Sequence, residues 1–143
     1  MTVASILKSK GTNIITTKVG DSVSHASSVL ADNNIGAVLV LDDAGNLAGI
    51  LSERDIVSAL AGSGSGCLIV NVEDLMTSNV IVCEPADSLD DILIMMTDKR
   101  IRHVPVLDDG ELLGVVSIGD VVKRRMDAVE QEANAMRDYI ATG

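Results

Sequence analysis

Two short elements of the chain carry residue types that suit the binding of a polar small molecule. They read Gly49-Ile-Leu-Ser52-Glu-Arg-Asp55 and Gly114-Val-Val-Ser117-Ile-Gly-Asp120. In each element an apolar run ends at a serine, and an aspartate follows three residues later, where an apolar helical stretch begins. A carboxylate accepts two hydrogen bonds from a vicinal diol, and a hydroxyl beside the amides of a helix N-terminus suits a phosphate. The two elements therefore indicate sites for ligands with hydroxyl or phosphate groups.

The same residues also have a structural interpretation. Aspartate is a preferred capping residue, so Asp55 and Asp120 could be N-caps of the helices that follow them, and capping is compatible with ligand binding. Ser52 and Ser117 are open to both interpretations. Arg54, inside the first element, is either a phosphate ligand or an exposed surface charge.

The two elements belong to an internal repeat. Residues 35–43 align with 101–109 at an offset of 66, and residues 45–57 align with 110–122 at an offset of 65. Of these 22 paired positions 12 are identical, which chance does not produce. The offset of 66 also places Asp21 opposite Asp87 and aligns two segments with the spacing of one apolar helix face.

The repeat predicts the elements that must position these residues. Each copy reads as a short strand, an amphipathic helix, two strands joined by an Asp- and Gly-containing turn, and a second helix, in the order β-α-β-β-α. One copy of this size is near the lower limit for burying its own core, so we expect two copies to pack together. We expect repeats at 9–66 and 72–127, an amphipathic helix at 128–143, and a flexible linker at Ala61–Gly66.

This pattern resembles the CBS (cystathionine-β-synthase) domain, which occurs as a tandem pair called a Bateman module. The resemblance covers most of the chain and rests on the doubled motif, on Leu75-Met76-Thr77, and on Arg102-His103-Val-Pro105-Val106. It implies an α+β fold of two repeats packed about a pseudo-two-fold axis, with an extended C-terminal helix. It also implies a regulatory module that binds an adenosine-containing ligand in the cleft between the repeats: AMP as the probable ligand, or ATP, ADP, NAD(H) or S-adenosylmethionine.

The resemblance implies roles for individual residues as well. Asp55 and Asp120 would hold ribose hydroxyls, and Ser52 and Ser117 would contact phosphate. Further candidates come from the family's use of the first strand of each repeat in binding. They are Thr12, Thr77, Ser78 and the backbone near Val80.

The two copies are not equivalent, which predicts one strong and one altered site. Gly36-Ala37 in the first copy becomes Arg102-His103 in the second, and Arg54 becomes Gly119. The resemblance implies that groups from both repeats line the central clefts, so we expect Arg54, Arg102 and His103 to converge on one phosphate, which guanidinium groups bind in a bidentate manner. For His103 a hydrogen-bonded structural role on a strand edge is the alternative.

Composition excludes several classes of function. A formal charge of −10 argues against nucleic acid or an anionic membrane as the partner. The chain has no membrane-length apolar run or signal-peptide pattern, and its two cysteines lack metal or redox spacing, so we expect a cytoplasmic protein without a metal. No phosphate loop, nucleophile elbow or metalloprotease motif is present, so we expect no enzyme and no catalytic cofactor.

The C-terminal segment carries a narrow apolar seam. Val122, Met126, Val129, Ala133, Met136 and Ile140 follow the 4-3-4-3-4 spacing of coiled-coil a and d positions. This helix either packs on its own module, forms a homodimer contact, or docks a regulated protein partner. The alternative function is therefore a non-catalytic scaffold with empty clefts, which acts through dimerisation or through this helix.

Overall fold

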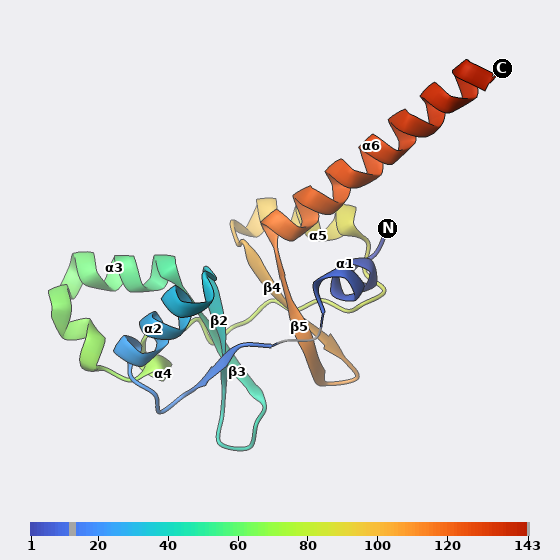
Figure 1. The fold of residues 1–143 in the computed structure, drawn as a ribbon. Coiled ribbons are helices and arrows are strands. Elements are labelled where there is room, and N and C mark those ends of the chain that lie inside the picture. Colours follow the sequence, from blue (N-terminus) through green and yellow to red (C-terminus); the bar gives the residue numbers. More distant parts are fainter. Residues whose placement is uncertain (12–13, 143) are drawn as a thin grey trace. The chain divides into compact units, whose positions relative to one another are not determined.

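The computed structural model describes residues 1–11 and 14–142, and its internal contacts divide the chain into two compact units. We call Asn13–Ile81 the N-repeat unit, and Met1–Thr12 together with Val82–Gly143 the C-repeat unit. Figure 1 shows both units along the chain, from the blue N-terminus to the red C-terminus. Each unit is a mixed layer of helix and strand, as the α+β prediction requires.

The N-repeat unit follows the predicted β-α-β-β-α order. Its sheet has the strand order β1-β2-β3, with β1 parallel to β2 and β2 antiparallel to β3. Its elements are β1 (Thr16–Lys18), α2 (Val23–Asn33), β2 (Ala37–Leu41), β3 (Leu47–Ser52), α3 (Glu53–Ser63), a 3-10 helix (Gly64–Ile69) and α4 (Val72–Leu75).

The C-repeat unit repeats this order with a reduced first strand. Its elements are α1 (Val3–Lys10), α5 (Leu89–Lys99), β4 (His103–Asp108), β5 (Glu111–Ser117) and α6 (Ile118–Thr142). In place of a strand, Cys83 forms a single parallel bridge to Val106. These two residues match Thr17 and Val40, which pair in the N-repeat unit 66 residues earlier in sequence.

Pro85 explains why the first strand stops in the second copy. In the N-repeat unit the Val19 N–H donates to the Leu41 carbonyl at 3.0 Å. Pro85 stands at the matching position and has no N–H to donate to Leu107. The predicted first strand is therefore present in one copy and shortened to a bridge in the other.

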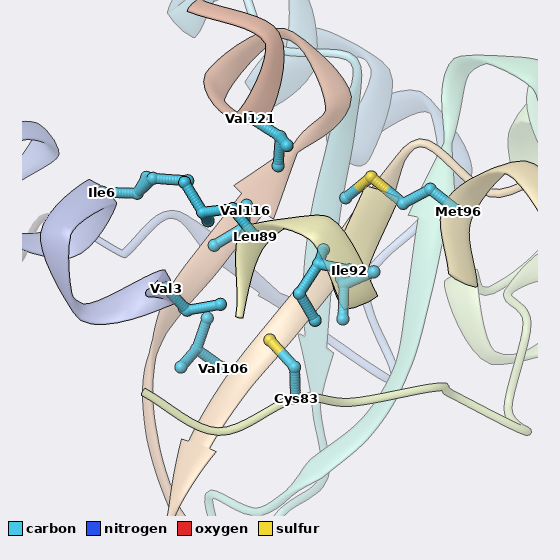
Figure 2. Packing of buried hydrophobic residues seen from close by; sticks show 10 residues of the cluster. Val3, Ile6, Cys83, Leu89, Ile92, Met96, Val106, Val116 and Val121 are labelled. Atoms are coloured by element: carbon cyan, nitrogen blue, oxygen red, sulfur yellow. The ribbon is translucent and has the colours of Figure 1, made fainter. Parts of the chain in front are cut away.

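Each unit has its own apolar core, on the helix faces that the spacing predicts. In the N-repeat unit α2 buries Val23, Ala26 and Leu30 against the sheet. In the C-repeat unit, α5 buries its matching face beside residues of α1, the strands and α6 (Figure 2). That cluster consists of Val3, Ile6, Cys83, Leu89, Ile92, Met96, Val104, Val106, Val116 and Val121.

The helix that leads each repeat packs on the unit of the other repeat. Helix α1 precedes the first repeat in sequence but packs against β5 and α6. Helix α4 stands at the head of the second repeat and packs against α3 and β3. The compact units therefore do not follow the repeat boundaries read from the sequence.

Two connections have a definite conformation. Asp109 and Gly110 have φ of 53° and 81°, and this double positive φ matches the tight hairpin turn predicted between β4 and β5. The prediction of a flexible linker at Ala61–Gly66 is wrong, because α3 runs to Ser63 and the 3-10 helix follows, with Cys67 4% exposed.

The extended C-terminal helix of the fold prediction is confirmed. The segment expected at 128–143 is the continuation of α6, which runs without a break from Ile118 to Thr142. Among the described helices, none has the length and apolar character needed to cross a membrane.

Candidate functional site

The glycine of the first motif lies where another segment crosses the strand. Ile50 N donates to the Thr77 carbonyl at 3.0 Å, and Thr77 N donates to the Ile50 carbonyl at 2.9 Å. A Cβ added to Gly49 would lie 2.6 Å from Met76 Sδ and 2.8 Å from the Thr77 oxygen. Glycine is therefore required by this close approach, and Thr77 lies beside the motif strand.

The serine and aspartate of the first motif are hydrogen-bonded to each other. Ser52 ends β3, its Oγ accepts from Asp55 N at 3.2 Å, and its own N donates to Asp55 Oδ2 at 2.9 Å. This is a capping box, in which Ser52 is the N-cap and Asp55 is the third helical residue, so the structural alternative that Asp55 is itself the N-cap does not hold. Asp55 Oδ1 accepts no hydrogen bond within the described residues, which leaves it available to a ligand.

The second motif has the same geometry. Ser117 Oγ accepts from Asp120 N at 3.1 Å, and Ser117 N donates to Asp120 Oδ2 at 2.9 Å. His103 lies opposite Ser117 in the β4–β5 register, and Ile118 N donates to the Arg102 carbonyl at 2.8 Å. The structure therefore brings four of the predicted site residues together in the C-repeat unit.

The sequence interpretation missed Lys10, which completes this cluster. Its Nζ lies 2.7 Å from Asp120 Oδ2 and donates to the Val115 carbonyl at 3.0 Å. Burial raises the pKa of Asp120, but the hydrogen bonds from Lys10 and Ser117 outweigh it, so this pKa lies below its ordinary value of 3.8. At the offset of 66, the residue that matches Lys10 is Met76. Extending the repeat alignment back to residue 10 would have exposed this difference.

The remaining candidates are spread over the N-repeat unit. Arg54 is exposed and makes no ion pair with any described residue. Because Arg54 lies in one unit and Arg102 and His103 lie in the other, their convergence on one phosphate stays a prediction. Ser78 is exposed and Val80 is partly buried near the end of the unit. Thr12 lies outside the described residues.

A hollow of about 470 Å³ lies in the N-repeat unit, on α2, α3 and the segment before β2. Its lining is mostly apolar, with Leu30, Ile35 and Ile56 among the lining residues. None of the predicted ligand-binding residues lines it, but Glu53 does, so the hollow adjoins the Ser52–Asp55 element. The described residues contain no group of three or more His, Cys, Asp or Glu side chains placed to hold a metal ion.

Comparison with known proteins connects this architecture to one family. The CBS domain model matches residues 3–62 and 72–127. A CBS-domain-containing protein from Agrobacterium tumefaciens has a similar crystal structure, with 42% identity, 87% of this chain and 92% of that chain covered, and a TM-score of 0.85. The mitochondrial CBS domain-containing protein CBSX3 from Arabidopsis thaliana is 32% identical over 99% of this chain and 73% of its own length.

A third relative was crystallised with ligands. The CBS domain pair of protein MJ0100, in complex with 5′-methylthioadenosine and S-adenosyl-L-methionine, is 29% identical to this chain, with a TM-score of 0.79. The similarity covers 90% of this chain and 98% of that chain. With two matched repeats and CBS pairs among its structural neighbours, the chain belongs to the CBS domain family as a tandem CBS pair.

Proposed function

We propose that this CBS pair is a regulatory module that binds an adenosine-containing ligand through its two Ser–Asp elements. The observation that carries the proposal is the duplicated capping box, which fixes Asp55 and Asp120 rigidly at the strand-to-helix junctions. Each carboxylate keeps acceptor capacity for a ribose diol after accepting from the serine N–H. The adenosyl ligands of the MJ0100 pair, neither of which carries a phosphate, support the nucleoside as the common recognised group.

Phosphate recognition is the second part of the proposal. Arg54 in the N-repeat unit and Arg102 with His103 in the C-repeat unit supply the predicted cationic and imidazole groups. Lys10 is a further cationic candidate, because an ammonium has three N–H donors and the described residues engage two of them, through Asp120 and the Val115 carbonyl. We therefore place AMP first among the ligands, with ATP, ADP and NAD(H) as the other phosphorylated candidates.

The proposed module performs no reaction. A ligand changes the behaviour of such a protein only by binding one conformation or one association state more tightly than another. We propose that the module acts as a cytoplasmic homodimer and that a regulated protein partner responds to its ligand-bound state.

A non-catalytic scaffold is the second candidate function. The observation that favours it is the outer part of α6, which carries exposed apolar side chains. In that case the Ser–Asp elements would be capping boxes only, and the protein would act through dimerisation or through α6.

Thermal unfolding of the full chain with a panel of nucleosides tests the proposal. AMP, ATP, NADH, S-adenosylmethionine and 5′-methylthioadenosine are compared with GMP and CMP as controls for the base. A ligand at about 100 times its Kd adds about 2.7 kcal/mol of stability, which raises the Tm by roughly 5–10 °C. We expect a shift of this size with at least one adenosine compound and none with GMP or CMP. No shift with any adenosine compound would contradict the proposal and favour the scaffold.

A further inference from the structure

The outer part of α6 is exposed in the described part of its unit. From Val129 to Thr142 every side chain except Ala133 is exposed, and Figure 1 shows the helix continuing beyond the strands of its unit. The predicted seam is part of this surface: Met126 is 66% exposed, Val129 and Met136 are each 60% exposed, and Ile140 is 72% exposed. A helical segment of this length is marginal without packing on an apolar face, so a partner must cover the seam.

The charges beside the seam define which partner fits. With Met126, Ala133 and Ile140 as a positions, and Val122, Val129 and Met136 as d positions, the flanking positions follow directly. The e positions are Lys123, Glu130 and Arg137, and the g positions are Arg125, Glu132 and Tyr139.

We propose that a second copy of this chain covers the seam, with the two α6 helices parallel and in register. In a parallel pair each g residue faces the e residue five positions further along the other helix. Arg125 then faces Glu130 of the second copy, and Glu132 faces Arg137 of the second copy, so both contacts join opposite charges. Two-fold symmetry doubles them to four attractive contacts.

The antiparallel arrangement with the same overlap is disfavoured. It places e opposite e and g opposite g, so Glu130 would meet Glu130, Glu132 would meet Glu132, and Lys123 would meet Arg137 of the second copy. Like charges at these positions oppose association. The charge pattern therefore selects both the occupant and its direction, which specifies the surface of the proposed homodimer without depending on any ligand.

The Glu132–Arg137 contact offers the cleaner test. Arg125 already lies 3.3 Å from Asp90 of its own chain, in an exposed pair that would compete with a second copy. Glu132 and Arg137 have no ion pair among the described residues. They are five positions apart, so they are not neighbours on one helix, and exchanging their charges changes no ion pair within the helix. Arg137→Glu does remove the exposed hydrogen bond that Arg137 Nη1 donates to Asn134 Oδ1 at 3.3 Å.

Sedimentation equilibrium of the full chain and of two charge variants measures the dissociation constant of the dimer. Glu132→Arg places arginine opposite arginine twice, and we expect the dimer to dissociate about tenfold more readily. Adding Arg137→Glu restores opposite charges and should return the dissociation constant to within about twofold of the original. A monomeric wild type, a single variant that dimerises normally, or a double variant as weak as the single one would each overturn the proposal.

Cysteine cross-linking tests the direction and register. A d residue faces the same residue of the second copy only in the parallel arrangement, so Met136→Cys should form a disulfide-linked dimer under mild oxidation. Asn134→Cys, on the outer face, is the matched control and should not cross-link. The native cysteines do not interfere, because Cys67 and Cys83 are 4% and 3% exposed.

Two cross-linking results would overturn the proposal. Equal cross-linking of Met136→Cys and Asn134→Cys would show random collision instead of a defined seam. Cross-linking only in a mixture of Met126→Cys and Met136→Cys chains would show antiparallel helices. Because both experiments are run without nucleotide, they can succeed or fail independently of the proposed ligand binding.

Discussion

Lys10 Nζ lies 2.7 Å from Asp120 Oδ2, so the motif carboxylate of the C-repeat unit is ion-paired. Asp55, at the matching place in the N-repeat unit, has no cationic partner among the described residues, and Met76 stands where the repeat would place a second lysine. The two copies therefore share a backbone geometry at their motifs and differ in charge. This difference arises from α1, a helix that lies ahead of the first repeat in sequence.

Replacing Lys10 by methionine, the residue at the matching position of the other copy, should lower the stability only slightly. The side chains of Lys10 and Asp120 are 41% and 26% exposed, so we expect Lys10→Met to lower the free energy of unfolding by about 0.5–1 kcal/mol. Urea denaturation near pH 7 measures this change. Lys8→Met is the matched control, because Lys8 is exposed on the same helix and makes no ion pair with a described residue.

The effect of Lys10 should disappear in acid. The pKa of Asp120 is lowered in the folded protein, so its ionised form stabilises the fold fully above the ordinary value of 3.8, and this contribution is lost as the pH falls through the folded pKa. The stability difference between wild type and Lys10→Met should therefore be constant between about pH 7 and pH 5 and should shrink below about pH 4. A difference that grows in acid would contradict this account of the ion pair.

Replacing each motif glycine by alanine should destabilise the protein to different extents. At Gly49 an added methyl meets the Thr77 backbone oxygen at 2.8 Å, which moves only with the chain. At Gly114 the nearest atom is Leu7 Cδ2 at 3.1 Å, the end of a flexible side chain. We expect Gly49→Ala to destabilise by about 1–3 kcal/mol and Gly114→Ala by clearly less. Equal losses in thermal unfolding would show that the crossing at Met76 and Thr77 is not rigid.

Variants of Asp55 should separate the contribution of its hydrogen bond from that of its charge. Asp55→Ala removes the acceptor for Ser52 N and should cost about 0.5–2 kcal/mol of stability. Asp55→Asn keeps an acceptor oxygen in the same place, so we expect most of the stability to remain. Chemical denaturation of both variants decides this, and equal losses would show that the charge of Asp55, instead of the hydrogen bond, stabilises the junction.

The thiol of Cys83 should be unreactive in the folded protein. Burial, with a smaller contribution from the charge of Asp87, raises the pKa of Cys83 to about 12, so the thiolate is scarce near pH 8. We expect iodoacetamide to alkylate Cys83 at least about a hundredfold more slowly in the native protein than in urea. Peptide mass spectrometry gives both rates, and similar rates would place Cys83 outside the core.

The repeat allowed much of the fold to be predicted. The helix faces that bury Ala26 and Ile92 follow from i, i+3, i+4, i+7 spacing, which is a local property of the chain. The exchange of α1 and α4 between the units could not be predicted in this way, because it depends on which surface a short helix covers after folding. The shortened first strand did have a signal, since Pro85 replaces Val19.

The candidate site was likewise predictable only in part. Ser52 and Asp55 could be singled out because their spacing is local and is repeated, although the N-cap of α3 is Ser52 and not Asp55. Lys10 was missed because its partner lies 110 residues away in sequence. The contact between Thr77 and Ile50 was missed for the same reason, since a backbone pairing across elements leaves no periodic pattern.

Calorimetric titration with AMP tests the central claim most directly, with wild type compared with the double variant Asp55→Asn/Asp120→Asn. The asparagines keep the acceptor for each serine N–H, so the fold is retained while the carboxylates are lost. We predict micromolar binding to wild type, and binding weakened at least about tenfold in the double variant, which corresponds to one lost charged hydrogen bond to ribose. Equal affinity in the two proteins would contradict the claim that the Ser–Asp elements hold the ligand, and 5′-methylthioadenosine titrated in parallel shows whether phosphate is needed.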